Sequence, residues 1–337
     1  MNEQISSIGR RSLSGQPLDR ADLTTLAGLW QDHLHDLLYW ANQVRTSRFG
    51  RAVRLCSIVA GKTGRCSEDC KWCAQASRYK TQCPSHRAAG GEIVEAAKTA
   101  HRRGACHIGV VNSGRHPSAD DLQTVVEAAA AIGSPEGAGI RCCAALGELT
   151  PQQARDLAAA GIVRYNHNLE TSRRMFAQVV TTHTFDDRLA TLAAARAAGM
   201  ELCCGGIFGL GETWDDRIDL AMTLRDEVRP HATPLNFLHP IPGTPMGGRT
   251  PMSPSEILAT IAIFRLAMPD VDLKIAGGRE LNLRDLQSWM FYAGGTSCLV
   301  GDYLTTKGRG AEEDLKMIAD LGLEVVDEFP PRISRRP

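Results

Sequence analysis

The stretch Cys66-Ser67-Glu68-Asp69-Cys70-Lys71-Trp72-Cys73 decides how this chain is organised. Its three thiols have C-x3-C-x2-C spacing, so this short loop can wrap three sulfurs around one face of an iron–sulfur cluster, whose irons prefer thiolate ligands. Three ligands rather than four leave one iron open to bind and activate a small molecule. A structural zinc site is the alternative, but zinc usually takes further ligands from a second C-x2-C pair, which this chain lacks.

The composition restricts the class of protein. The chain has 337 residues, 43% of them hydrophobic, and formal net charge zero, which suits one large barrel-type domain or two ordinary domains. Neutrality gives no reason to expect nucleic acid or an anionic membrane as partner. No apolar run approaches the ~20 residues of a membrane helix, and no apolar signal core begins the chain, so we expect a cytoplasmic protein. The eleven cysteines suit metal ligands and buried thiols better than disulfides.

Short apolar runs alternate with helical patterns along most of the chain. The runs begin near Val53, Cys106, Ile140, Val163, Leu202, Leu235, Val271 and Ser297. The helical patterns span Glu92–Arg103, Ala119–Ile132, Pro151–Ala160, Phe185–Ala198, Trp214–Val228, Pro254–Met268, Leu281–Tyr292 and Glu312–Leu321. Eight strands, each followed by a helix, predict an α/β fold whose parallel sheet closes into a (β/α)8 TIM-type barrel. An open doubly wound sheet would need fewer units, and no G-x-G-x-x-G turn follows the first strand.

The predicted barrel occupies residues 46–325. Residues 1–45 have leucines at three- and four-residue spacing and predict a helical extension outside the barrel. Residues 326–337 form the predicted C-terminal tail, and the residues past Glu328, with Pro330-Pro331 and Arg335-Arg336, are predicted to be frayed. Chemistry in such barrels lies at the C-terminal ends of the strands. The Cys66–Cys73 loop follows the first strand at that end.

Several further motifs give the chain a family resemblance. They are Ser57-Ile58, Lys62-Thr63-Gly64, Cys73-Ala74-Gln75, Arg78-Tyr79-Lys80-Thr81, Tyr165-Asn166-His167-Asn168-Leu169-Glu170 and Gly205-Gly206-Ile207-Phe208-Gly209-Leu210-Gly211-Glu212-Thr213. From about Leu37 to Gly322 the chain resembles the biotin synthase family of radical S-adenosylmethionine (SAM) enzymes. The resemblance implies a sulfurtransferase of biotin biosynthesis that inserts sulfur between C6 and C9 of dethiobiotin. It implies a [4Fe–4S] cluster on Cys66, Cys70 and Cys73, SAM, and an auxiliary iron–sulfur cluster that donates the sulfur.

The most informative polar pattern lies on the fourth predicted strand. Asn166, Asn168 and Glu170 alternate, so all three face one side of the strand. Inside a barrel such groups need a ligand or one another as partners, and an internal polar network is the alternative to a binding site.

The resemblance assigns roles to these and other residues. Asn168 and Glu170 would hold the SAM ribose, while Asn166 and Asn236 would bind the ureido ring of dethiobiotin. A strand-end turn is the other interpretation of Asn236. The SAM site would also include Trp72, the backbone around Ile207, and His183 near the SAM carboxylate. Arg188 is predicted to be a helix-surface or salt-bridge residue.

The auxiliary cluster is where the chain departs from the family. The family pattern of three cysteines and an arginine keeps Cys143 and Cys203 but has Gly109 and Lys274 at the other two positions. Lysine lacks the planar fork of arginine and must lose a proton to bind iron. Cys56, which we expect at the barrel end nearest the cluster loop, could join Cys143 and Cys203 in holding a [2Fe–2S] or a four-iron, sulfur-donating cluster. The alternative for Cys56 is a buried packing thiol.

Two other functions compete with this one. The first is another radical SAM enzyme of the same group with a different small substrate. The second is a non-catalytic scaffold that binds zinc or a cluster. The resemblance further implies a homodimer and an electron donor such as flavodoxin or ferredoxin.

Overall fold

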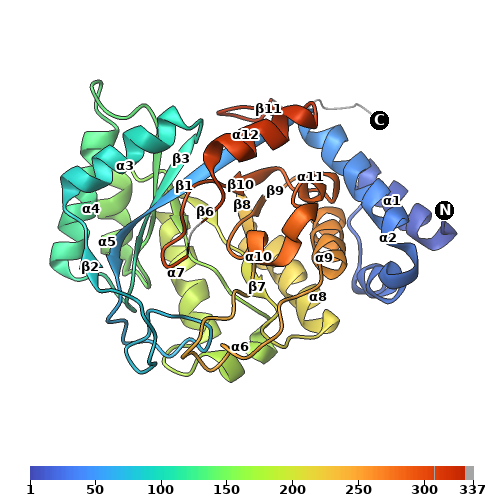
Figure 1. Cartoon of the computed structure of the whole chain (residues 1–337), viewed down its shortest axis with the longest axis horizontal. Coiled ribbons are helices and arrows are strands. Elements are labelled where there is room, and N and C mark those ends of the chain that lie inside the picture. The colour runs from blue at the N-terminus through green and yellow to red at the C-terminus, as the bar shows by residue number, and fades with distance from the viewer. Residues whose placement is uncertain (307, 331–337) are drawn as a thin grey trace.

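Eight parallel strands pair in chain order, and the last pairs with the first, so that the sheet closes into a barrel (Figure 1). The computed structural model describes residues 1–306 and 308–330. The barrel strands are β1 Ala52–Thr63, β3 His107–Asn112, β4 Arg141–Ala145, β5 Arg164–Asn166, β6 Glu201–Cys203, β8 Ala232–Phe237, β9 Asp272–Ile275 and β10 Ser297–Leu299. Every predicted strand is present, and the predicted (β/α)8 barrel is confirmed.

Three short strands add to this sheet. They are β2 His86–Arg87, β7 Gly206–Phe208 and β11 Glu324–Val325. β7 follows β6 after a break and pairs with β8, so the two segments act as one interrupted barrel strand. β2 and β11 both pair with β1.

Helices surround the barrel and largely follow the predicted pattern. They are α1 Glu3–Ser14, α2 Arg20–Phe49, α3 Gly90–Arg102, α4 Ala119–Ile132, α5 Pro151–Ala159, α6 Arg173–Val179, α7 Phe185–Ala197, α8 Trp214–Thr223, α9 Pro254–Ala267, α10 Arg279–Leu283, α11 Trp289–Tyr292 and α12 Ala311–Asp320. Ser118, Thr150 and Ser253 cap α4, α5 and α9 with their hydroxyl groups.

Two helix predictions need correction. The predicted helix 281–292 is broken into α10, the 3-10 turn η2 (Arg284–Leu286) and α11, because Arg284 takes a left-handed backbone (φ 51°) that interrupts the α-helical hydrogen bonds. The predicted helix 214–228 is α8 followed by a π-helical turn, η1 (Leu224–Val228).

The N-terminal extension is a helical hairpin on the outside of the barrel. α2 continues to Phe49, past the predicted end at residue 45, and begins with an Asp19 capping box. A Cβ atom on Gly9 of α1 would lie 2.3 Å from the Trp40 ring, so the two helices approach closely because this residue is glycine. Ser12 donates to the carbonyl of Leu266, and Arg45 donates to that of Gly295, which fixes the hairpin to the barrel helices.

The C-terminal segment is packed as far as it is described. The amide of Val326 donates to the carbonyl of Val53 at 2.9 Å, and the Phe329 ring lies 4.8 Å from the Phe49 ring. The prediction of fraying past Glu328 is therefore wrong for Phe329, because its ring packs against that of Phe49 on α2. Residues 331–337, with Pro331 and Arg335-Arg336, lie outside the described residues.

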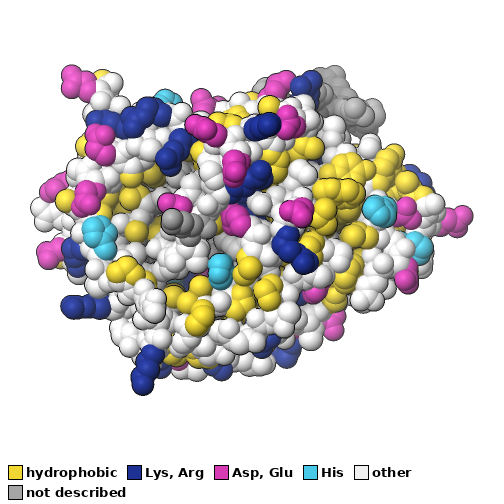
Figure 2. All heavy atoms as spheres, in the orientation of Figure 1, with side chains coloured by type: hydrophobic (Ala, Val, Ile, Leu, Met, Phe, Trp, Pro, Cys, Tyr) yellow, Lys and Arg dark blue, Asp and Glu magenta, His cyan; other side chains and the backbone are white. Residues whose placement is uncertain are grey.

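Exposed hydrophobic side chains gather where α2, α10 and α11 meet (Figure 2). This apolar face consists of Tyr39, Leu281, Leu286, Trp289 and Tyr292, each 36–40% exposed. Single exposed hydrophobic residues are ordinary, but an exposed group of this size often marks a contact surface.

Among the described residues, no helix has the length and hydropathy needed to cross a bilayer.

A buried ion pair reinforces the seam where β10 meets β1. Arg54 on β1 donates to Asp272 on β9 at 2.5 Å, across the intervening strand. Asp272 also accepts from Ser297 on β10 at 2.7 Å and from Thr296 at 2.8 Å. Burial alone would raise the pKa of Asp272, but the Arg54 ion pair and these hydrogen bonds hold that pKa far below its ordinary range.

We expect Asp272→Asn to lower the free energy of unfolding by about 3–5 kcal/mol at pH 7, because Arg54 keeps a buried charge without a partner. A depressed folded-state pKa means that ionised Asp272 stabilises the fold above the ordinary carboxyl pKa of about 3.9, and that this stabilisation is lost as the pH falls through the folded-state value. The difference in urea midpoint between wild type and variant should therefore shrink below about pH 4. Asp320→Asn, at an exposed site on α12, is the control. A difference that stays constant down to pH 2 would contradict the account.

Candidate functional site

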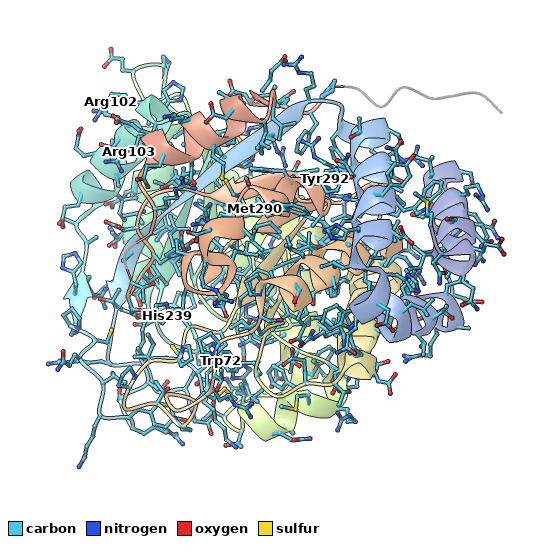
Figure 3. All side chains as sticks on the ribbon, turned by 45° about the vertical axis from the view of Figure 1, so that its right-hand side comes forward. Trp72, Arg102, Arg103, His239, Met290 and Tyr292 are labelled. Carbon is cyan, nitrogen blue, oxygen red and sulfur yellow. The ribbon has the colours of Figure 1, made fainter. Side chains whose placement is uncertain are left out.

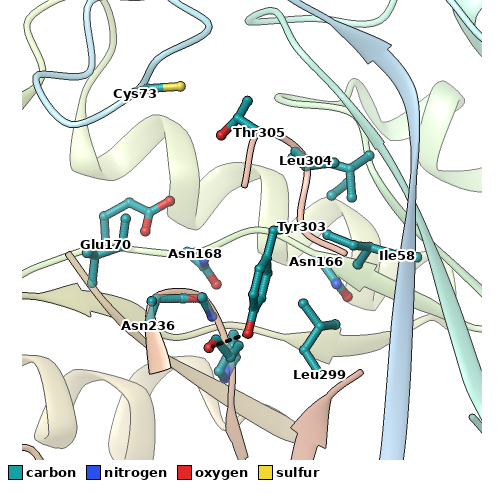
Figure 4. A pocket seen from close by; sticks show the side chains of 18 of the residues that line it. Ile58, Cys73, Asn166, Asn168, Glu170, Asn236, Leu299, Tyr303, Leu304 and Thr305 are labelled. Atoms are coloured by element: carbon teal, nitrogen blue, oxygen red, sulfur yellow. Dashed lines mark hydrogen bonds between the residues drawn. The ribbon is translucent and has the colours of Figure 1, made fainter. Parts of the chain in front are cut away.

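A cavity of about 480 Å³ opens at the C-terminal ends of the barrel strands and reaches into the barrel. Figure 4 shows Cys73 on its loop beside the opening, with Asn166, Asn168, Glu170 and Asn236 on the walls. The deeper wall carries thiols of the strands β1, β4 and β6. Thiols near the opening and thiols near the floor thus border one continuous space, with amide and carboxyl groups between them.

The cluster loop is held by the carboxylates inside its own motif. Asp69 accepts hydrogen bonds from the backbone amides of Thr181 and Thr182 at 2.9 and 3.3 Å, and from both hydroxyl groups. The amide of Lys71 donates to the carbonyl of Val179 at 3.0 Å. Burial would raise the pKa of Asp69, but the hydrogen bonds from Thr181 and Thr182 lower it overall. The residues between the cysteines therefore fix the loop to the segment after α6.

The thiols of Cys70 and Cys73 suit a metal cluster better than free thiolates. Burial raises the pKa of Cys70 far above the usual thiol value, and raises that of Cys73 to about 11. These thiols ionise readily only when a bound metal supplies the compensating positive charge. Among the described residues, no three Cys, His, Asp or Glu side chains converge on a point the size of one ion. A zinc ion needs such convergence, whereas each thiolate of an iron–sulfur cluster binds a different iron.

Glu170 sits at a strained backbone position that the glycines of the next strand accommodate. Its φ is +67°, which is rare for a residue other than glycine. Its carbonyl accepts from the Ile207 amide at 2.7 Å. A Cβ atom on Gly206 would lie 2.6 Å from that carbonyl oxygen, and one on Gly205 would lie 1.9 Å from the carbonyl oxygen of Pro234. The Gly205-Gly206 pair is therefore needed for this close approach, which brings Glu170 and Ile207 together at the cavity wall.

A chain of polar contacts leads from Glu170 to the cluster loop. Arg188 lies 3.7 Å from the Glu170 carboxylate and donates from Nε to His183 Nε2 at 3.0 Å. The other ring nitrogen of His183, Nδ1, hydrogen-bonds Glu68. Burial and the Arg188 charge lower the pKa of His183, which suits a neutral ring that donates to Glu68 and accepts from Arg188.

These polar contacts change the expected roles of two residues. His183 does lie next to the three loop cysteines, but both of its nitrogens are engaged by other side chains. Arg188 does form the expected salt bridge, yet it is buried and borders the cavity, so the helix-surface interpretation is wrong. Arg188 follows His183 by only five residues, and this closeness in the sequence could have indicated that the two side chains meet.

The predicted polar pattern begins at Asn166, the last residue of β5, continues beyond the strand and borders the cavity. Asn166, Asn168 and Glu170 all line it. Asn168 Oδ1 accepts from the Gly205 amide at 3.1 Å, whereas Asn166 Oδ1 and Glu170 Oε2 are buried without a hydrogen-bond partner. Buried polar atoms are nearly always paired in native proteins. These two unpaired oxygens therefore fit a site whose remaining partners belong to a ligand.

Asn236 also lines the cavity, but its side chain is partly engaged. Its Nδ2 donates to the carbonyl of Gly206 at 3.1 Å, and its Oδ1 accepts from the Gly277 amide at 2.9 Å. One N–H and one lone pair of the amide remain for a ligand. Asn236 therefore connects neighbouring strand ends and also borders the cavity.

The deep wall contains the three cysteines expected to hold a second cluster. Cys56, Cys143 and Cys203 line the cavity, while Cys142 and Cys204 do not, as the alternation of side chains along a strand requires. Burial raises the pKa of Cys143 to about 12 and also raises that of Cys203, and the nearby Cys56 adds to both.

The expected position of Cys56 needs correction. Cys56 is in the first half of β1, level with His107 at the start of β3 and with Leu299 on β10. It therefore lies deep in the barrel and not at the end nearest the cluster loop, because the rest of an extended strand separates it from Cys66.

Lys274 places a positive charge beside the thiols deep in the barrel. Its amine donates to Cys203 Sγ at 3.8 Å. Burial alone would lower the pKa of Lys274, but Cys203 and Cys56 raise it above the ordinary lysine value. A protonated amine has no lone pair for iron, which agrees with the expected loss of the family ligand at this position.

Loops at the ends of the strands form the remaining wall. Residues 303–306 line the cavity, and the Tyr303 hydroxyl donates toward Glu280 at 3.0 Å and the Ala276 carbonyl at 3.2 Å. Trp72 and His239, which lie on the same side of the molecule in Figure 3, also line it. The sequence did not single out His239, because a loop that crosses a barrel mouth has no periodic pattern.

Comparison with known proteins identifies relatives over nearly the whole chain. Residues 62–224 match the Radical SAM superfamily, and residues 234–324 match the Biotin and Thiamin Synthesis associated domain. The chain is 45% identical to the biotin synthase of Nitratidesulfovibrio vulgaris (strain Miyazaki F) over 305 residues, which is 88% of this chain and 82% of that protein. It is 43% identical to the biotin synthase of Pelotomaculum thermopropionicum over 323 residues, which is 96% of this chain and 100% of that protein.

Solved structures support the fold. Methylornithine synthase (PylB) superposes with a TM-score of 0.82 at 20% identity, covering 95% of this chain and 97% of that chain. The [FeFe]-hydrogenase maturase HydG gives 0.81 at 16% identity, covering 96% of this chain and 75% of that chain. At such identities the likeness concerns the barrel fold alone.

We expect Asp69→Asn to weaken retention of the loop cluster without unfolding the barrel. The neutral amide cannot accept as strongly from Thr181 and Thr182, and hydrogen bonds to a charged group are worth about 1.5–3 kcal/mol. Iron bound per chain after anaerobic gel filtration should fall, and visible absorbance should bleach faster in air. Asp186→Asn, at an exposed ion pair, is the control. Iron retention equal to that of the control would show that the Asp69 clamp is not needed.

Proposed function

The chain belongs to the biotin synthase family of radical SAM enzymes, and we propose that its barrel cavity is the place where dethiobiotin receives sulfur. The enzyme is a sulfurtransferase that uses a [4Fe–4S] cluster, SAM and an auxiliary iron–sulfur cluster to make biotin. One observation carries the proposal: a single cavity connects Cys73 on the cluster loop with the thiols of Cys56, Cys143 and Cys203. A substrate between them would meet a hydrogen-abstracting group on one side and a sulfur source on the other.

The side of the cavity near the loop is proposed to bind SAM. Cys66, Cys70 and Cys73 would hold the [4Fe–4S] cluster, which supplies the electron that cleaves SAM to a 5′-deoxyadenosyl radical. The unpaired Oε2 of Glu170, together with Asn168, would accept from the ribose hydroxyl groups. The interrupted strand at Ile207 offers backbone to the adenine, and Trp72 adds an aromatic wall.

The carboxylate end of SAM is assigned to Arg188 rather than to His183. Arg188 borders both the main cavity and the smaller space around the loop cysteines. A guanidinium group can bind a carboxylate through two parallel hydrogen bonds. His183 and Glu68 would hold Arg188 in place, which explains why both His183 nitrogens are already engaged.

Asn166 and Asn236 are proposed to orient dethiobiotin. A cyclic urea has two N–H donors and one carbonyl acceptor, which the free Oδ1 of Asn166 and the remaining N–H of Asn236 complement. Asn166 is level with Cys203 on the adjacent strand. A ring held there would place the hydrocarbon carbons between the deep thiols and the SAM side.

The auxiliary cluster is proposed to rest on Cys56, Cys143 and Cys203, with Lys274 as counter-charge. Whether it is a [2Fe–2S] or a four-iron cluster depends on its remaining ligand. Flavodoxin or ferredoxin is the proposed electron donor. The eleven cysteines are all free, which suits a reducing cytoplasm.

The apolar face of Tyr39, Leu281, Leu286, Trp289 and Tyr292 is proposed to bind a second copy of the chain. It lies on α2, α10, η2 and α11, away from the cluster loop. Aromatic residues of this kind are typical of the centre of protein interfaces.

The activity test is an anaerobic reaction with dethiobiotin, SAM and a strong reductant, followed by mass spectrometry. Biotin and 5′-deoxyadenosine should both form, at near two deoxyadenosines per biotin. Cys70→Ala should abolish both products, whereas Cys142→Ala, at a buried thiol outside the cavity, should keep both. Deoxyadenosine without biotin in the wild type would point to another substrate of the same radical site.

Asn166→Ala should raise the KM for dethiobiotin about tenfold or more, because removing one hydrogen bond in a buried site costs about 1–3 kcal/mol. Slow SAM cleavage without dethiobiotin should persist, since Asn166 is not assigned to SAM. An unchanged KM for dethiobiotin in this variant would contradict the assignment of Asn166 to the substrate site.

Trp289→Lys should shift the protein from dimer to monomer in light scattering after gel filtration, because a charged side chain at the centre of an apolar interface is not compensated. Val163→Lys, at another exposed hydrophobic position near the start of β5, should leave the dimer intact. A dimer that survives Trp289→Lys places the interface elsewhere.

A further inference from the structure

His107 is an imidazole that lines the cavity together with the three cysteines of the proposed auxiliary site. It begins β3 and is level with Cys56 on β1. Two residues further along β3, on the same face, Gly109 is level with Cys143 on β4. Because parallel neighbours in register point to the same side of a sheet, Cys56, His107 and Cys143 all face the barrel interior.

The imidazole of His107 has a hydrogen-bond partner at only one of its nitrogens. His107 is 2% exposed, and its Nε2 is buried without a partner. Its Nδ1 lies 3.1 Å from Cys106 Sγ, and Cys106 does not border the cavity. The contact with Cys106 thus fixes the ring from behind, as metal-binding histidines are usually fixed through the nitrogen that does not bind the metal.

The other basic groups nearby are poor ligands. The Lys274 amine already donates to Cys203 Sγ at 3.8 Å. Arg164 does not border the cavity, and its Nε and Nη2 both donate to Glu201 at 2.9 and 2.5 Å. A guanidinium group also keeps its proton in proteins. Neutral imidazole is the group here that can offer a lone pair to iron without losing a proton first.

Gly109 contributes by leaving space beside the histidine. A Cβ atom there would meet the Ile58 side chain at 3.5 Å and the Asn166 amide at 3.8 Å. A cysteine at this position would therefore project its sulfur into the centre of the wall. With glycine, the nearest inward-facing metal-binding side chain on β3 is His107, one step deeper.

We propose that Nε2 of His107 is the fourth protein ligand of the auxiliary iron–sulfur cluster, beside Cys56, Cys143 and Cys203. This inference rests on the proposed function, which supplies the cluster and its three thiolates. A Cys₃His ligand set has one negative charge fewer than a Cys₄ set, and replacing thiolate by histidine raises the potential of iron–sulfur centres. The buried charges of Lys274 and Arg164 act in the same direction.

The test isolates the auxiliary site in the full-length chain. The parent protein carries Cys66→Ala, Cys70→Ala and Cys73→Ala, so that bound iron reports the deep site alone. It is labelled with ¹⁵N in histidine only, reconstituted, reduced and studied by pulsed EPR. We expect a directly coordinated histidine nitrogen in the parent. His107→Cys should keep the iron and lose this nitrogen coupling, while His231→Asn, at an exposed histidine, should keep both.

A second measurement does not depend on the parent's folding. In the chain with an intact cluster loop, His107→Ala should at least halve the iron and sulfide bound at the auxiliary site, with the melting temperature of the metal-free protein as the check on folding. Unchanged iron and sulfide would overturn the assignment. So would a nitrogen coupling that is absent from the iron-loaded parent or persists in His107→Cys. A folded parent that binds no iron would instead defeat the auxiliary site itself, and the two failures are therefore distinguishable.

Discussion

Closure of the barrel between β10 and β1 is the constraint on which the rest of the molecule depends. Closure encloses the inward side chains of eight strands, so that polar groups there lose water and must find partners inside. Arg54 and Asp272 satisfy this requirement at the seam by pairing with each other. The groups higher in the barrel do not all pair with one another. Asn166 Oδ1, Glu170 Oε2 and His107 Nε2 stay without a protein partner.

The same closure brings together groups that are far apart in the chain. Each strand contributes only one or two inward positions at a given level, so a ligand inside the barrel must be held by several strands at once. The four groups assigned to the auxiliary cluster come from β1, β3, β4 and β6, and Lys274 comes from β9. The positive charge of Lys274 beside Cys203 offsets part of the cost of thiolates in this buried space.

The cluster loop and the cavity wall are also mechanically connected. Glu68 and Asp69, inside the cysteine motif, contact the 181–183 segment, and His183 contacts Arg188, which pairs with Glu170. A loop without secondary structure is thereby held in a fixed position relative to the part of the cavity wall that carries the Glu170 carboxylate. The left-handed backbone of Glu170 adds local strain of the kind found at functional sites, and Gly205 and Gly206 allow it.

The sequence by itself determined the barrel and the first cluster, because both depend on local patterns: the alternation of strand and helix, and three thiols in one short loop. Period-two alternation also determined that only one cysteine of each adjacent pair can face inward, and the family resemblance selected Cys143 and Cys203. Tertiary structure alone decided the depth of Cys56, the burial of Arg188 and the unpaired nitrogen of His107. These features depend on the register between strands and on packing across the barrel, which no local pattern of residues encodes.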